Sequence, residues 1–341
     1  MAVRRMRLIT NTKGRTRLAG PVYRLNRRLG ANGRFRLPVI RALQRRRRFR
    51  DAGRGTGGER VPRLVSVGEC IVELFGDIES GYRLRFEGAA VEMAKRMRGH
   101  LGADWSIDLF TALGDDFYSQ KIVDDLVASG VGTSPIFKVA GRNVGLSLVG
   151  DPGERGPRVT NWRSQSAARL MADDVDALAA AFADADLIFA SGAAFAILAP
   201  RARGRLLKAL HRARNGGARI VLYPLEWPDL WTSRRVLGSA INTIATVADA
   251  VFTPSVGEHS VFGDASAEAI AARYHTWGVE EVLLQSREHG VFLSTRGGGR
   301  WIEAGPGQQS DDLNSGYLAA RLSGLEPEAA ARRLFGQVHR G

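Results

Sequence analysis

Cysteine is almost absent from this sequence, and so are long apolar runs. Cys70 is the single cysteine among 341 residues, so no disulfide can form within the chain. This usage fits a reducing compartment, and we expect a cytoplasmic protein. No run reaches the roughly eighteen apolar residues that a membrane-spanning helix needs, so we expect no membrane partner. The six histidines lie far apart in the sequence and lack a cysteine cluster beside them, which excludes the usual zinc spacings.

Acidic residues are scarce at the N-terminus. The first 63 positions hold 20 Lys and Arg against two acids, a net charge of +18, whereas the whole chain carries +14 and the remainder therefore −4. A like-charge block without sustained apolar periodicity is typical of disorder, so residues 1–62 are interpreted as a basic, disordered arm. It could be an RNA- or membrane-binding tail, a transit-like peptide, or translated sequence ahead of the true start. Nucleic acid is expected as a partner only if this arm is part of the protein.

From Arg63 onward, short apolar strands alternate with amphipathic helices. The β-branched run at 64–74 predicts a buried strand, and the Gly/Pro-rich segment 144–163 predicts a hairpin. Further strands are expected at 105–113, 187–192, 220–223, 250–253 and 282–284, and helices at 91–101, 119–129, 200–215, 233–248 and 265–277. Such alternation predicts a mostly parallel sheet with helices on both faces.

Three collinear motifs give this body a family resemblance. They read Val67-Gly-Glu-Cys-Ile-Val-Glu-Leu74, Thr111-Ala-Leu-Gly-Asp-Asp-Phe117 and Asn314-Ser-Gly-Tyr-Leu-Ala-Ala-Arg-Leu322. In this order the sequence resembles the 2-keto-3-deoxygluconate kinases of the ribokinase-like (PfkB) carbohydrate kinase family. The resemblance implies an α/β fold, a ribokinase-like three-layer α/β/α sandwich with a central sheet of about eight strands. It also implies a kinase domain over 63–341 and a small β-lid drawn from about 78–87 and 137–163.

The resemblance also implies a chemistry, the in-line transfer of the γ-phosphoryl group of ATP to a sugar or keto-acid sugar hydroxyl, assisted by Mg²⁺. Asp311 falls on the position of the family's catalytic base, just before a helix expected to start near Leu313, and Asn314 belongs to the same nucleotide-facing motif. Ser310 replaces the glycine that usually precedes the base. Alternatively, Asp311 or Asp312 is simply the N-cap of this helix.

Two positions are expected on the sugar side. Gly88 is the residue that 87–92 retains from the family's sugar loop, and Arg163 falls on an arginine that pairs with a sugar carboxylate. Arg163 could instead be a solvated arginine at a strand end. Glu92 stands where the family has an amide, and its negative charge should repel an acid sugar.

On the nucleotide side, the resemblance implies cofactor-binding roles for Glu258 and Gly290. Glu258 could hold Mg²⁺ through a water molecule or act as a carboxylate at a helix start. Gly290 ends the segment Gln285-Ser-Arg-Glu-His-Gly290, in which Arg287 replaces a glycine of the family's nucleotide loop.

Two functions therefore stay open. One is an ATP- and Mg²⁺-dependent sugar kinase that uses Asp311, and the other is an inactive relative, a pseudokinase that binds a ligand or a protein on the same scaffold. The departures at 285–290, 87–92 and 305–311 favour the second. The sequence also ends where relatives continue through another helix, and relatives often dimerise through the lid, so a homodimer is expected from the resemblance.

Overall fold

The computed structural model describes residues 60–153, 156–225, 228–286, 288–303 and 312–336. The prediction of a disordered arm falls almost wholly outside these residues. Among the residues described, no helix combines the length and apolar character that crossing a bilayer requires.

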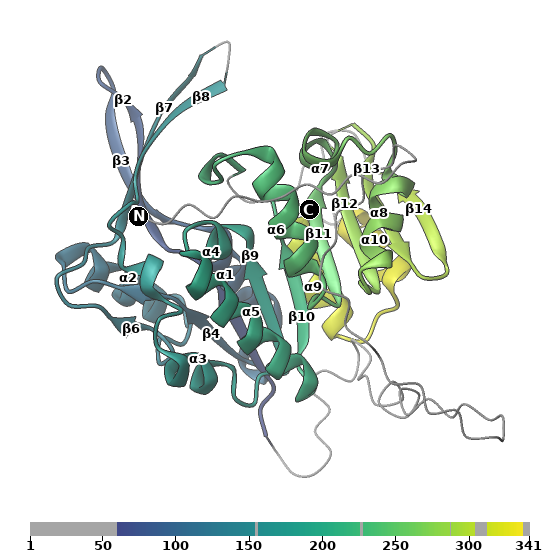
Figure 1. The fold of residues 1–341 in the computed structure, drawn as a ribbon, viewed down its shortest axis with the longest axis horizontal. Helices are drawn as coiled ribbons and strands as arrows, with labels where there is room; N and C mark the ends of the chain where they lie inside the picture. The colour runs from purple at the N-terminus through teal and green to yellow at the C-terminus, as the bar shows by residue number, and fades with distance from the viewer. Residues whose placement is uncertain (1–59, 154–155, 226–227, 287, 304–311, 337–341) are drawn as a thin grey trace, which may run out of the picture. The chain divides into compact units, whose positions relative to one another are not determined.

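An eight-stranded sheet forms the centre, in the order β14-β13-β12-β11-β10-β9-β1-β4 (Figure 1). Six neighbouring strands are parallel, and β13 and β14 are antiparallel additions at one edge. The strands are β1 (Arg63–Val67), β4 (Ser106–Phe110), β9 (Leu187–Ser191), β10 (Arg219–Tyr223), β11 (Ala250–Pro254), β12 (Glu281–Ser286), β13 (Gly290–Thr295) and β14 (Gly298–Ile302). The predicted mostly parallel sheet is thus confirmed.

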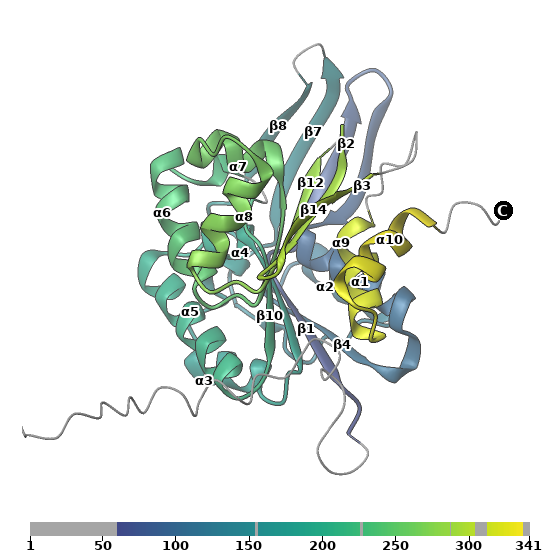
Figure 2. The same cartoon turned by 90° about the vertical axis from the view of Figure 1, so that its right-hand side faces the viewer.

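Helices cover both faces of this sheet (Figure 2). One face carries α3 (Val175–Phe182), α4 (Gly192–Ala196), α5 (Pro200–Asn215), α6 (Arg234–Ala245), α7 (Ser255–Phe262) and α8 (Ala267–Thr276); the other carries α1 (Ala89–Leu101), α2 (Phe117–Ala128), α9 (Leu313–Leu322) and α10 (Pro327–Gly336). Short 3₁₀ turns lie at η4 (Gly102–Asp104), η5 (Ala167–Leu170) and η6 (Pro228–Leu230).

The two helical layers explain why the strands have continuous apolar runs. In β9, Ile188 and Ala190 belong to the core on one side of the sheet, whereas Leu187 and Phe189 belong to the core on the other. A strand buried on both faces needs apolar residues at every position rather than at every second one.

A second, four-stranded sheet forms the lid, in the order β3-β2-β7-β8 (Figure 1). Its strands are β2 (Ile71–Asp77), β3 (Gly81–Glu87), β7 (Gly145–Gly153) and β8 (Gly156–Trp162), which confirms the predicted hairpin. The predicted lid bounds were partly wrong, because β2 belongs to the lid whereas β6 (Phe137–Lys138) pairs with β5 (Ala112–Leu113) outside it.

The apolar run 64–74 is two strands rather than one, which corrects the sequence-based prediction. It divides between β1 of the central sheet and β2 of the lid. The chain changes sheets at Gly68, where a Cβ atom would lie 2.5 Å from the Cβ atom of Ala90. Both halves are apolar, so the pattern contains no signal for the break.

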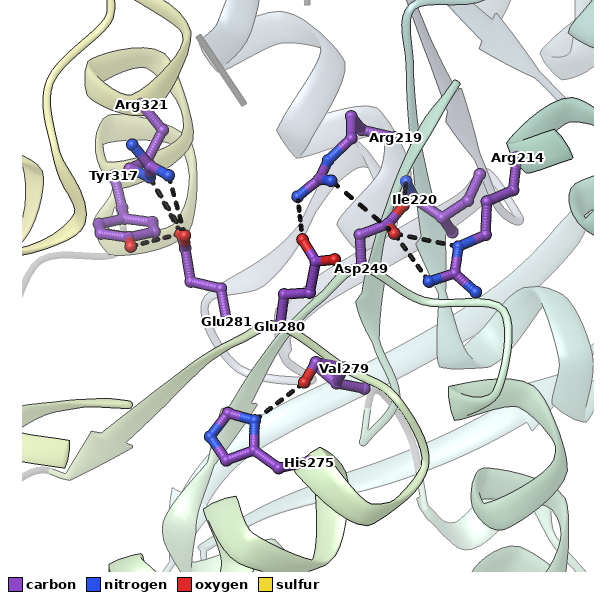
Figure 3. A network of polar contacts seen from close by, with 10 residues as sticks. All are labelled: Arg214, Arg219, Ile220, Asp249, His275, Val279, Glu280, Glu281, Tyr317 and Arg321. Atoms are coloured by element: carbon purple, nitrogen blue, oxygen red, sulfur yellow. Dashed lines mark hydrogen bonds and ion pairs between the residues drawn. The ribbon is translucent and has the colours of Figure 1, made fainter. Parts of the chain in front are cut away.

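Ion pairs hold the amino edge of the central sheet, the edge at which its parallel strands begin (Figure 3). Asp249, just before β11, accepts hydrogen bonds from Arg214 at 2.8 Å and from the backbone N–H of Ile220 at 2.9 Å. Glu281, the first residue of β12, pairs with Arg321 of α9 at 3.0 Å. Tyr317 donates its hydroxyl proton to the same carboxylate, and burial raises the pKa of Tyr317 well above its ordinary value. These contacts fix α9 against the sheet.

Candidate active site

The carboxyl edge of the sheet lies opposite this network and begins with a close backbone contact at Gly88. Gly88 precedes α1, has φ 142°, and would place a Cβ atom 2.2 Å from the carbonyl oxygen of Glu69. Only glycine tolerates both the conformation and the approach. The structure therefore requires Gly88 for the junction of α1 with the lid, and its contact with a sugar stays a prediction.

A buried ion pair lies where the chain passes from the central sheet into the lid. Arg163, directly after β8, donates hydrogen bonds to Oε2 of Glu69 from Nε at 2.9 Å and from a terminal nitrogen at 2.5 Å. Ser166 donates to the other oxygen at 3.0 Å. Because Arg163 is only 5% exposed, the interpretation as a solvated strand-end arginine is wrong. Pairing of Arg163 with a sugar carboxylate stays a prediction.

Sequence reasoning gave Glu69 no role, although it belongs to the first family motif. Its side chain is 1% exposed, and both of its oxygens are occupied by Arg163 and Ser166. A glutamate inside an otherwise apolar run is a signal for such a partner, because a buried carboxylate needs one. The partner itself lies 94 positions away and could not be identified from spacing.

The base of the lid holds further carboxylates. Arg85 of β3 donates to Glu73 of β2 at 2.6 Å and pairs with Glu87 at 2.9 Å. Burial raises the pKa of Glu87, although Arg85 acts in the opposite direction. Glu92 in the first turn of α1 pairs with Arg96 at 3.4 Å. The start of α1 therefore lies among both arginines and carboxylates, with the carboxylates in the majority.

The second family motif organises the chain that leads into the lid. Asp116 caps α2 by accepting hydrogen bonds from the backbone N–H groups of Tyr118 and Ser119, and it also accepts from the N–H of Val144, just before β7. Burial works against ionisation of Asp116, but these bonds and one from the Ser119 hydroxyl outweigh it and lower its pKa. Because Asp116 is the cap, α2 starts at Phe117, two residues before the predicted position.

The third motif starts α9. Asp311, the predicted base, lies outside the described residues, and the helix begins at Leu313 as expected. Asp312 occupies the N-cap position without a side-chain hydrogen bond to the backbone N–H groups of the first turn. Its carboxylate instead contacts Nε2 of His100 at 2.9 Å. The cap interpretation is thus confirmed for the position of Asp312 but not for its side chain.

Two segments that the sequence predicts to face a nucleotide meet at this helix start. Gln285, near the end of β12, donates a hydrogen bond of 2.6 Å to the side-chain oxygen of Asn314. After Gln285 the chain turns into β13 at Gly290, whose φ of 85° favours glycine. Arg287 lies outside the described residues. The structure thus brings Asn314 close to the segment that ends at Gly290, and their contact with a nucleotide stays a prediction.

Glu258, in the first turn of α7, is fully buried and belongs to a separate polar cluster. It accepts hydrogen bonds from Thr253 at 2.8 Å and from Tyr274 at 2.6 Å, and it pairs with Arg273 at 2.6 Å. Burial and the neighbouring Glu258 raise the pKa of Tyr274 well above its ordinary value. Both oxygens of Glu258 thus have protein partners, which supports its position as a helix-start carboxylate, and its water-mediated role toward Mg²⁺ stays a prediction.

The described residues contain no group of three or more His, Cys, Asp and Glu side chains that could hold a metal ion. Cys70 is buried, and burial raises the pKa of its thiol, so it is not an activated nucleophile. The carboxyl edge therefore offers charged clusters at the lid junction and at α7, and a helix start without a side-chain cap at α9.

Comparison with known proteins places this arrangement in a family. The model of the pfkB family carbohydrate kinases matches residues 63–333. A 2-dehydro-3-deoxygluconokinase of Escherichia coli K12 is 27% identical over 290 residues, which cover 80% of this chain and 92% of that protein. Another protein of this name, from Dickeya dadantii, is 25% identical over 79% of this chain and 91% of its own length.

Solved structures agree with the sequence matches. The structure of a PfkB protein from Polaromonas sp. JS666 has a TM-score of 0.71 at 24% identity and covers 81% of this chain and 93% of that one. A fructokinase with bound ATP from Xylella fastidiosa has a TM-score of 0.70 at 17% identity and covers 81% and 91%. At these identities the structures establish the shared ribokinase-like fold. Because the family model also matches most of the sequence, this chain belongs to the pfkB family of carbohydrate kinases.

Proposed function

We propose that the protein transfers the γ-phosphoryl group of ATP to a hydroxyl of a sugar or sugar acid, with Asp311 as the general base. The observation that carries the proposal is the start of α9, where Asp312 at the N-cap position makes no side-chain hydrogen bond to the first-turn N–H groups, directly after the position of Asp311. Uncapped N–H groups at a helix start favour a phosphate, because they point toward it and the helix dipole attracts negative charge. Helices α1, α5 and α7 also start without a side-chain cap, so the support for the proposal comes from the position of Asp311 directly before the open start of α9.

In this proposal the residues of the chain have separate tasks. Asp311 accepts the proton of the acceptor hydroxyl as the new oxygen–phosphorus bond forms and the bond to ADP breaks. The N–H groups at the start of α9 stabilise the charge on the transferred group. Asn314 is proposed to face the nucleotide, beside Gln285. Mg²⁺, bound with ATP, would neutralise phosphate charge, and the described residues provide no preformed cluster of ligands for it.

The relatives named 2-dehydro-3-deoxygluconokinase make a keto-acid sugar the first acceptor to test. Arg163 and Gly88 are the proposed contacts on the sugar side. Glu92 at the start of α1 adds negative charge, although it pairs with Arg96, and this charge disfavours an acid acceptor, so neutral hexoses belong in the same panel. We propose a cytoplasmic location, which a single buried cysteine permits.

The test is phosphoryl transfer from ATP·Mg²⁺ to this panel, with Asp311→Asn beside Asp312→Asn as the matched control. Removing a general base should lower kcat by about 10²- to 10⁴-fold, whereas the neighbouring variant should keep most of the activity. Equal activity of wild type and Asp311→Asn would refute the assignment. A wild-type protein that transfers phosphate to no sugar would favour the inactive, ligand- or protein-binding alternative.

We also propose that two copies associate through the lid. One face of the lid sheet carries rows of apolar side chains at directly opposed positions, and Tyr82, Leu84 and Trp162 on it are 42%, 43% and 56% exposed. Exposed apolar faces of this kind mark interaction sites. In sedimentation experiments Trp162→Lys should shift a dimer to monomer, and Lys121→Gln on α2 should not; a wild-type monomer would contradict this proposal.

A further inference from the structure

Helix α5 has an unusual charge pattern. It carries six Arg and Lys residues and no Asp or Glu, and α6 beside it on the same face carries two cations and no acid. Arg201, Arg205, Lys208 and Arg212 are spaced by four, three and four positions, so they line one side of α5 over about 17 Å. We call these four residues the α5 stripe. The rest of the domain is mildly acidic, which makes the stripe a local feature.

Three of the four cations of the stripe have no acidic partner among the described residues. Arg205 binds the carbonyl oxygen of Ala172 at 2.5 Å and also contacts Asp173. Arg201, Lys208 and Arg212 are exposed and form no ion pair in the part of the chain that the structure describes. Like charges three or four positions apart destabilise a helix, so this pattern costs helix stability, and among the described residues only Arg205 of the stripe has an acidic partner.

The stripe borders a groove between α3 and α5. The groove has a volume of about 540 Å³, with Leu178, Phe182 and Ala209 among the apolar residues that line it and Arg205, Lys208 and Arg212 along one wall. The opposite wall includes Asp184. Three further acids lie at the start of α3. Asp173 binds Arg205 and Asp174 caps α3, whereas Asp176 is exposed.

The described chain starts beside the same groove. Arg60 donates a hydrogen bond to the carbonyl oxygen of Asp184 and pairs with Asp186, both at 2.8 Å. The 59 residues before it contain 18 Lys and Arg and two acids. A polyanion in the groove would therefore lie next to the point at which the basic segment joins the domain.

We propose that the α5 stripe binds the phosphodiester backbone of a nucleic acid. A linear polymer of phosphates matches a row of cations about one helical turn apart, and such contacts release counterions. A membrane surface fits less well, because it requires large apolar side chains beside the cations. On the described parts of α3, α5 and α6, the large exposed apolar side chains are Val175 and Val236. This inference is independent of the kinase proposal.

The test compares full-length variants with equal charge loss. The stripe variant is Arg201→Gln/Lys208→Gln/Arg212→Gln, and the control is Lys121→Gln/Arg296→Gln/Arg333→Gln, which removes three exposed cations from other elements. Affinity for a labelled oligouridylate of about 20 nucleotides is measured by fluorescence anisotropy across a salt series. Thermal unfolding of each variant checks that the fold is retained.

For a single strand, loss of three phosphate contacts should reduce the slope of log affinity against log salt by about 2. The control should keep the wild-type slope, and Arg201→Lys/Arg212→Lys should keep it as well, because the charges remain. Equal slopes in the stripe variant and the control would overturn the proposal, since binding would then follow net charge alone. A stripe variant that no longer binds phosphatidylserine vesicles but binds RNA as the wild type does would also overturn the proposal.

Discussion

The buried pair of Glu69 and Arg163 gives the most direct test of how the lid is joined to the central sheet. The side chains are 1% and 5% exposed, and the charged nitrogen and oxygen lie 2.5 Å apart. Removing one partner leaves an unpaired charge in a buried site, which typically costs about 3–5 kcal/mol. Arg163→Met should therefore lower the free energy of unfolding by this amount and the melting temperature by about 10 °C.

Urea unfolding in the absence of ligand measures the loss. Glu69→Gln should have a comparable effect, and the double variant should recover about 1–3 kcal/mol of the summed losses, because it leaves no unpaired charge. Arg158→Met, an exposed arginine of β8, is the matched control and should change stability by less than about 0.5 kcal/mol.

An Arg163→Met variant that unfolds with the wild-type free energy would contradict this role of the pair. Arg163 would then be a residue that faces a ligand rather than one that fastens the lid, and its loss would raise KM for the sugar without affecting stability. Strictly additive losses in the double variant would likewise show that the two charges do not depend on each other.

Three further substitutions should lower the free energy of unfolding by amounts that the local contacts predict, and urea unfolding measures each of them. Asp116→Ala should lower the free energy of unfolding by about 1–2 kcal/mol, because a helix cap is lost. The folded pKa of Asp116 is lowered, so its stabilising contribution is present above its ordinary pKa of 3.8 and is lost as pH falls through the lower folded pKa. A variant that loses as much stability at acid pH as at neutral pH would contradict this. Gly88→Ala, with a Cβ atom 2.2 Å from a carbonyl oxygen, should cost more than about 2 kcal/mol, whereas Gly81→Ala, with nothing within 4 Å, should cost clearly less. Tyr274→Phe should lower the free energy of unfolding by about 1–3 kcal/mol, because it removes a hydrogen bond to the buried Glu258 carboxylate. An unchanged free energy of unfolding would mean that Arg273 and Thr253 alone are enough to stabilise this carboxylate.

Much of the fold could be predicted from local pattern. Helix α5 has the predicted bounds, and the hairpin of β7 and β8 lies within the predicted segment, because apolar periodicity and Gly/Pro turns are properties of neighbouring residues. The break between β1 and β2 was not predicted, because a glycine inside an apolar run does not by itself indicate that the chain passes from one sheet to another.

The candidate site was predicted less completely than the fold. Motif order predicted site roles for Gly88, Arg163, Glu258, Gly290 and Asn314, which stay predictions, and the structure brings the last two to neighbouring segments beside Gln285. It also gives Arg163 and Glu258 protein partners that the motifs did not indicate.

The sequence by itself determined the order of strands and helices, the family motifs and the uneven distribution of charge, because each of these is written in local runs of residues. Only the tertiary structure decided which charges neutralise one another. Glu69 and Arg163 are 94 positions apart and Glu281 and Arg321 are 40 apart, yet both pairs are buried, whereas Arg201, Lys208 and Arg212 of the α5 stripe stay exposed. Electrostatic energy depends on distance in space and on burial, and neither can be read from separation along the chain.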